Sequence, residues 1–223
     1  MNTLKPLALA LAFALLPTLS EAQTATSQTA KPIVRGDVYG LFGWLGVEEE
    51  SVRNYIGDDW HTSLSGTIGA GWHWTDHLKT EVDFGAGTQS TFYRAQPVGF
   101  PGYTGYRSTQ SSVSQKTLGL SQQYQFFRNA WFHPHVAIGA HVTWAEITDR
   151  VDPLVIYSPQ APPRTVEPAR TEGPRTDVTL RPFISGGFKA YFTQRGFFRT
   201  DLRFAFRDGI DEVQFRVGFG ADF

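Results

Sequence analysis

The chain has 223 residues, and its 20 Lys and Arg residues nearly balance its 21 Asp and Glu residues. This balance argues against a nucleic-acid-binding surface and against a polybasic lipid-binding patch, because both need an excess of positive charge. The sequence contains no cysteine, which excludes disulfides, zinc–thiolate sites and a thiol nucleophile. The length suits a single all-β domain.

The N-terminal residues have the features of a secretory signal peptide. Residues 1–22 combine an early lysine, a short apolar run, and Ser20 and Ala22 spaced as at a signal-peptidase site, so we expect cleavage after Ala22. The apolar run is shorter than the roughly 20 residues that a membrane helix needs. Residues 23–34 lack periodicity and predict a flexible periplasmic leader, and residues 35–223 are expected to form the folded domain.

Eight segments of the folded domain alternate apolar and polar residues with a period of two, which predicts β-strands. They cover residues 36–47, 62–74, 78–87, 113–126, 132–147, 178–192, 198–207 and 213–223. Such segments are long enough for tilted membrane strands, which need about 9–11 residues. The first segment has apolar residues on both faces, with Val38 and Phe42 on one and Tyr39 and Leu41 on the other, so the pattern does not choose its register.

Short and long connections alternate between the predicted strands, as they do in outer-membrane barrels. The short turns are centred on residues 75–77, 128–130 and 194–196, and the long polar connections are 48–61, 90–112 and 149–176. The final connection, 208–211, is short although it falls on the long-loop side, and its Asp-Gly pair suits a tight hairpin. We expect the turns in the periplasm, the long connections outside the cell, and an extended, semi-rigid chain in the proline-rich 149–176.

Volume predicts which way the apolar face points. An eight-stranded barrel has room inside only for its own side chains, and the bulky residues of the apolar face would overfill it. We therefore expect that face to meet lipid, with two aromatic girdles at the membrane interfaces. The expected girdles are Trp72, Trp74, Phe126, Phe127, Trp131, Phe132, Phe192, Phe197, Phe198 and Phe223 at the turn side, and Trp44, Trp60, Phe92, Tyr93, Trp144 and Phe206 at the loop side. The alternative is a periplasmic sandwich or lipocalin-like binder with scattered aromatic residues.

The last predicted strand carries a further signal. Residues 213–223 end on a phenylalanine and place Phe215, Phe219 and Phe223 on one face, which resembles the assembly signal of outer-membrane proteins. The folded domain resembles the small OmpA-type and OmpX-type β-barrels. This resemblance implies a single transmembrane, antiparallel up-and-down barrel in the bacterial outer membrane. It also implies that outer-membrane lipids and lipopolysaccharide surround the barrel, and that periplasmic chaperones and the barrel-assembly machinery act on it.

Ten charged residues share the face expected to line the lumen. They are Lys79, Glu81, Asp83, Arg181, Lys189, Arg199, Asp201, Arg203, Arg207 and Arg216. Unpaired charges in a narrow interior are costly, so we interpret them as a network of mutually paired charges that plugs the lumen. The alternative is a gate, in which charges exchange partners and open a narrow pore for small solutes, with a weak preference for anions.

Two further hypotheses concern histidines. His133 and His135 share a strand face, as metal ligands would, but Pro134 lies between them and no third ligand is evident nearby. Some eight-stranded barrels modify lipid A with a His, a Ser and a Glu, and the nearest grouping here is His141, Thr143 and Glu146, with threonine in the place of serine. A mid-strand threonine is ordinarily a strand former. We expect no catalytic residue, metal or other cofactor.

The long connection that contains Phe100, Tyr103 and Tyr106 is the remaining candidate for function. These aromatic residues suit contacts with a partner or with lipopolysaccharide sugars, although a solvated surface loop is the simpler interpretation. The sequence therefore predicts a non-catalytic outer-membrane barrel with a structural or surface-interaction role. A pore and a lipid-A-modifying enzyme are the alternatives.

Overall fold

A computed structural model describes residues 35–48, 60–100, 103–127, 131–158 and 161–223. The expected signal peptide (1–22) and leader (23–34) lie outside the described residues. Within the described ranges, no helix is long and apolar enough to cross a membrane.

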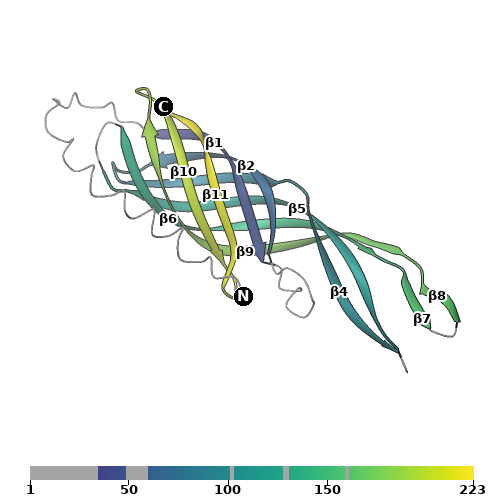
Figure 1. Ribbon diagram of the computed structural model, residues 1–223. Coiled ribbons are helices and arrows are strands. Elements are labelled where there is room, and N and C mark those ends of the chain that lie inside the picture. Colours follow the sequence, from purple (N-terminus) through teal and green to yellow (C-terminus); the bar gives the residue numbers. More distant parts are fainter. Residues whose placement is uncertain (1–34, 49–59, 101–102, 128–130, 159–160) are drawn as a thin grey trace, which may run out of the picture. The chain divides into compact units, whose positions relative to one another are not determined.

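In the part of the chain that the structure describes, eight antiparallel strands form a closed ring (Figure 1). In ring order they are β1 (Gly36–Glu48), β2 (Trp60–His73), β3 (Leu78–Gly87), β5 (Tyr103–Gln125), β6 (Phe132–Val151), β9 (Arg170–Tyr191), β10 (Gly196–Phe206) and β11 (Ile210–Asp222). The first and last strands close the ring in a register that pairs Asp37 with Asp222 and Trp44 with Phe215. The expected all-β, up-and-down barrel of eight strands is therefore confirmed.

The barrel is apolar outside and charged inside. Ile68 of β2 and Leu180 of β9 are 65% and 66% exposed, whereas Lys79 of β3 and Arg199 of β10 are buried in the lumen. A water-soluble barrel has the opposite arrangement. An apolar surface that surrounds the whole ring is stable in contact with lipid rather than water, so this is a transmembrane barrel.

The structure settles the register of β1, which the sequence pattern leaves open. Asp37 and Tyr39 point into the lumen, together with Leu41 and Leu45. Glycines on the neighbouring strands make room for them, since Asp37 pairs with Gly71 of β2, and Tyr39 pairs with Gly69 of β2 and Gly220 of β11. The inward face of β1 therefore adds a carboxylate and bulky side chains to the lumen.

Exposed aromatic side chains lie at both ends of the barrel. The turn side presents Trp72, Trp74, Phe126, Phe127, Trp131, Phe192 and Phe223, and the loop side presents Trp44, Trp60, Tyr93 and Trp144. Two of the expected girdle residues are corrected: Phe197 is fully buried inside the barrel, and Phe92 is buried against Val113 and Ile147. The expected assembly-signal residues Phe215, Phe219 and Phe223 all point outward from β11 or its end.

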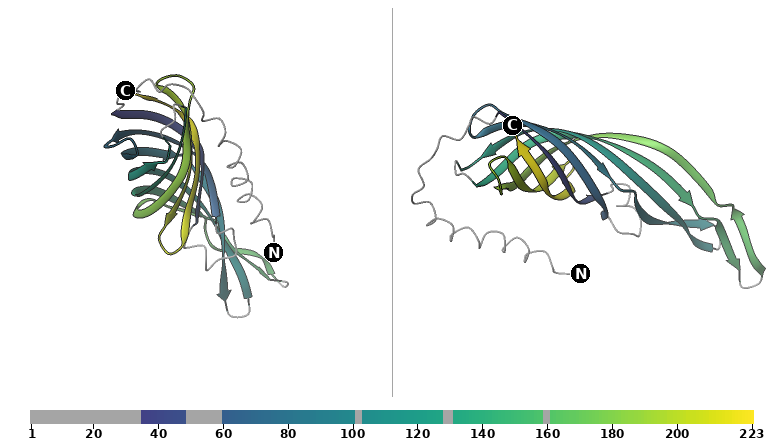
Figure 2. Two further views of the ribbon diagram at one scale, coloured as in Figure 1. Left: turned by 90° about the vertical axis from the view of Figure 1, so that its left-hand side faces the viewer. Right: turned by 90° about the horizontal axis from the view of Figure 1, so that it is seen from above.

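The described residues of the connections 90–112 and 149–176 are mostly paired β-strand, which corrects the expectation of long polar loops. β4 (Ser90–Phe100) pairs with the first half of β5, and β6 and β9 remain paired up to Val151 and Arg170. β7 (Leu154–Ser158) and β8 (Ala161–Glu167) form a separate two-stranded hairpin. We call β4, β7, β8 and the loop-side parts of β5, β6 and β9 the ribbons. Figures 1 and 2 show the ribbons continuing past the ends of the shorter strands.

A bulge lets the β6–β9 ladder continue through a proline. The register shifts between Ile147 and Asp149, opposite Gly173 and Pro174. Gly173 has a φ of 100°, a conformation that favours glycine. Proline lacks a backbone donor and is tolerated at such irregular or edge positions, so Pro174 does not prevent strand pairing here.

Candidate functional site

At the turn-side end of the lumen, the Asp37 carboxylate is held between two ammonium groups. Its Oδ2 accepts a hydrogen bond from Lys79 Nζ at 2.8 Å and another from Lys189 Nζ. All three side chains are fully buried. Lys79 also contacts Glu81, and the Lys189 ammonium lies 4.2 Å from the centroid of the Phe197 ring. These contacts compensate charges that would be costly if buried alone.

In the middle of the lumen, Arg199 bridges β10 to β3. Its two terminal nitrogens donate to the two oxygens of Glu81 at 2.6 and 2.9 Å, a fork-to-fork arrangement that fixes both side chains. The same guanidinium donates to Asp201 at 3.1 Å and stacks over the Tyr39 ring at 4.3 Å. The Arg199 guanidinium is therefore held by carboxylates along its edge and by the Tyr39 ring on its face.

The next pairs link β3, β10 and β11. Arg203 donates to both oxygens of Asp83, at 2.5 and 3.4 Å, and its guanidinium lies 3.8 Å from the centroid of the Phe183 ring. Arg216 is 3.0 Å from Asp201 and 3.8 Å from Asp83, so it joins two carboxylates that already have other partners. We call the connected set the lumenal network. Its members are Asp37, Lys79, Glu81, Asp83, Lys189, Arg199, Asp201, Arg203 and Arg216.

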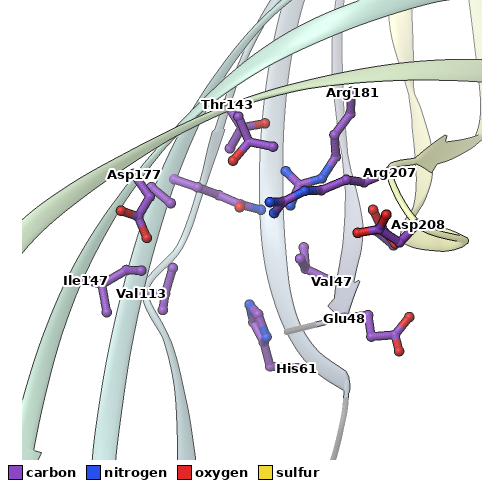
Figure 3. A pocket seen from close by; sticks show the side chains of 14 residues that line it. Val47, Glu48, His61, Val113, Thr143, Ile147, Asp177, Arg181, Arg207 and Asp208 are labelled. Atoms are coloured by element: carbon purple, nitrogen blue, oxygen red, sulfur yellow. The ribbon is translucent and has the colours of Figure 1, made fainter. Parts of the chain in front are cut away.

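On the loop side of this network, the lumen widens into a cavity of about 240 Å³. The cavity, which we call the vestibule, is lined by side chains from the loop-side ends of the strands, including Thr143, Arg181 and Arg207 (Figure 3). Near it, His141 Nε2 lies 3.4 Å from Glu212 Oε2, and both side chains are buried. The vestibule is therefore a chamber lined by polar and apolar side chains of the barrel wall.

The structure places the ten sequence-predicted lumenal residues in two groups. Eight of them belong to the lumenal network, and Arg181 and Arg207 line the vestibule instead. Sequence reasoning missed Asp37, because β1 has apolar residues on both faces. It also missed Glu212, although this residue has the same parity as Gln214 and Arg216 on β11, which was an available signal.

The inward position of Tyr39 requires glycines opposite it on the neighbouring strands. This requirement leads to a first prediction. A Cβ at Gly69 would overlap the Tyr39 ring, on which Arg199 stacks. We expect Gly69→Val to lower the free energy of unfolding by about 1–3 kcal/mol through overpacking. The matched control is Gly66→Val on the same strand, where a Cβ would meet nothing within 4 Å. Urea unfolding of both variants in lipid vesicles tests this, and equal losses would contradict it.

Among the described residues, the side chains that either histidine hypothesis requires are not assembled into a complete site. His133 and His135 both point inward, but among the described residues no group of three or more His, Asp or Glu side chains is arranged to hold a metal ion. His141 and Thr143 face the lumen, whereas Glu146 is exposed on the opposite face of β6. The three residues expected for lipid-A chemistry are therefore not brought together.

The ribbons carry their own buried polar cluster around Asp149. Its carboxylate accepts hydrogen bonds from Ser111 at 2.5 Å, Arg94 at 3.1 Å and Arg175 at 2.5 Å. Burial alone raises the pKa of the Asp149 carboxyl, but the hydrogen bonds from Ser111 and Arg175 help to lower it below its ordinary value. The cluster ties β4, β5, β6 and β9 together beyond the barrel, which gives the ribbons a defined internal structure.

No family model matches the sequence, and no curated protein does. Solved structures similar to this chain include the outer membrane protein OprG from Pseudomonas aeruginosa, with 14% identity, a TM-score of 0.49 and coverage of 85% of this chain and 97% of that chain. Ail of Yersinia pestis has 9% identity, a TM-score of 0.46 and coverage of 85% and 99%. Neisserial surface protein A has 10% identity, a TM-score of 0.46 and coverage of 84% and 96%.

The chain's own architecture carries the conclusion about its class. An eight-stranded barrel with an apolar exterior and a charged interior is the arrangement of the small OmpA-type and OmpX-type barrels of the bacterial outer membrane. The barrel architecture expected from the sequence is therefore confirmed.

Proposed function

We propose that this protein is a non-catalytic outer-membrane barrel whose lumen is closed by the lumenal network and which acts at the cell surface through its ribbons. The observation that carries the proposal is the chain of ion pairs that crosses the lumen from Asp37 to Arg216. Such a barrel would contribute to envelope integrity or to surface interactions rather than to solute flow.

The balance of charges supports a plug. The lumenal network contains four carboxylates and five cations, and Glu212 adds a fifth carboxylate nearby. The carboxylates are Asp37, Glu81, Asp83, Asp201 and Glu212, and the cations are Lys79, Lys189, Arg199, Arg203 and Arg216. Removing one partner from a buried ion pair costs about 3–5 kcal/mol, so a spontaneous path through the network would be costly.

Single-channel recording in planar bilayers tests the plug. We expect the refolded wild-type protein to show no discrete openings, because solute passage would require several buried pairs to separate at once. Glu81→Ala and Arg199→Ala each remove one side of the central fork and are recorded beside it. Discrete wild-type openings that either substitution alters would contradict the plug.

Those openings would instead support the second candidate, a narrow pore. The observation that favours it is the sharing of partners, since Arg199 bonds to both Glu81 and Asp201 and Arg216 lies between Asp201 and Asp83. Charges with two available partners can exchange them, and such exchange can open a narrow path. The same recordings therefore separate the two functions.

The ribbons are the part of the protein that we assign to surface contacts. The sequence of the β4–β5 hairpin includes the aromatic residues Phe100, Tyr103 and Tyr106, whose side chains lie outside the part of the chain that the structure describes. We propose them for contacts with lipopolysaccharide sugars or with a partner at the cell surface. Outer-membrane lipids, periplasmic chaperones and the barrel-assembly machinery complete the partners that we propose. Deletion of residues 90–112, with cell-surface binding of purified lipopolysaccharide as the readout, tests the role of this hairpin.

A further inference from the structure

The vestibule contains charges of both signs that the lumenal network does not include. Figure 3 shows the guanidinium groups of Arg181 and Arg207 projecting into it. The carboxyl-bearing residues Glu48, Asp177, Asp208 and Asp211 line the same cavity. A mixed lining of this kind is complementary to a ligand that also carries both charges.

Three buried polar atoms in this lining have no hydrogen-bond partner among the described residues. They are Arg181 Nε, Thr143 Oγ1 and Asp211 Oδ2. The Thr143 and Asp211 side chains are more than nine-tenths buried, at 1% and 8% exposure. A buried donor or acceptor without a partner is costly, and a bound ligand is one way to satisfy it. The vestibule therefore contains one cationic side chain, Arg181, and one carboxylate, Asp211, that each have a polar atom without a hydrogen-bond partner among the described residues.

We propose that the vestibule binds a small zwitterionic solute, a compact amino carboxylate, with its carboxylate toward Arg181 and Arg207 and its ammonium toward Asp211 and Asp208. Guanidinium groups match carboxylates in geometry as well as charge. The lining offers partners for both charges of such a ligand, whereas a simple anion or a simple cation would use only one of the two sets. The volume of about 240 Å³ restricts the ligand to a small molecule.

This site goes beyond the proposed plug and does not depend on it. The residues of the vestibule lie on the loop side of the lumenal network, so a solute can be bound there whether or not the network opens. Binding without conductance would leave both proposals standing. Conductance with binding would remove the plug and keep the site.

Isothermal titration calorimetry of the refolded full chain tests the proposal. The probes are unbranched amino carboxylates from glycine to aminohexanoate, with hexanoate and hexylamine as analogues that carry only one of the two charges. We expect at least one amino carboxylate to bind about tenfold more tightly than either analogue, a difference of about 1.4 kcal/mol.

Two substitutions assign the charges of the ligand to the protein. Arg181→Gln is expected to abolish the preference over hexylamine, and Asp211→Asn the preference over hexanoate. Arg207→Gln and Asp208→Asn, at exposed positions, repeat the test if either first variant fails to show the heat-modifiable mobility of a folded barrel. Arg195→Gln, on an exposed turn at the other end of the barrel, is the matched control and should change nothing.

Three results would overturn the proposal. The first is that no amino carboxylate binds to the wild-type protein. The second is that hexanoate or hexylamine binds as tightly as the best amino carboxylate, which would make the site a simple anion or cation site. The third is that binding survives the vestibule substitutions unchanged, which would place the ligand elsewhere on the barrel.

Discussion

Replacing Arg199 with alanine is expected to lower the free energy of unfolding by about 3–5 kcal/mol. The substitution leaves the buried Glu81 carboxylate without its two guanidinium hydrogen bonds and removes the group that stacks on Tyr39. Lys79 remains beside Glu81 but is also bound to Asp37, so it compensates only in part. Urea unfolding in lipid vesicles, followed by tryptophan fluorescence, measures the loss.

The double variant Glu81→Ala, Arg199→Ala tests whether the pair itself is responsible. Removing both charges leaves no unpaired charge in the middle of the lumen, because the ion pairs of Lys79 with Asp37 and of Asp201 with Arg216 remain. We therefore expect the double variant to lose less stability than the sum of the two single variants. Arg195→Ala, on an exposed turn, should change the free energy by no more than about 0.5 kcal/mol. Additive losses from the single variants would contradict a mutually dependent pair.

The barrel itself was predictable from the sequence because side-chain direction alternates along a strand. That period separates Val82 and Phe84, which face lipid, from Glu81 and Asp83, which face the lumen, without any knowledge of the partner strands. Volume then determines which face is inside. The same reasoning failed for β1, whose register depends on glycines in β2 and β11 that make room for Tyr39.

The contacts of the site were less predictable, because alternation gives the face of a residue but not its height in the lumen. Arg199 and Glu81 are 118 residues apart and lie on β10 and β3, which are not neighbours in the ring. Their meeting depends on the stagger of every strand between them. The ribbons were missed for a related reason, since the composition of 149–176 indicates extended chain, and only the distant pairing of β6 with β9 makes it a ladder.

The second large effect on the free energy of unfolding is expected at the apolar outer surface of the barrel, which faces lipid. Ile68 lies at the middle of β2, points outward and is 65% exposed in the absence of lipid. We expect Ile68→Arg to lower the free energy of unfolding in a bilayer by about 2–4 kcal/mol, because it places a charge at the depth of the hydrocarbon core. Ile68→Ala separates this cost from the loss of the isoleucine side chain and should be much milder.

The same substitution in the ribbons distinguishes a membrane barrel from a soluble one. Thr171 of β9 is also exposed, but it lies in the part of the strand that extends past the ring. Thr171→Arg meets water and is expected to change the free energy of unfolding by no more than about 0.5 kcal/mol. If Ile68→Arg were as harmless as Thr171→Arg, the outward face of β2 would be in water, and the apolar belt would require another partner.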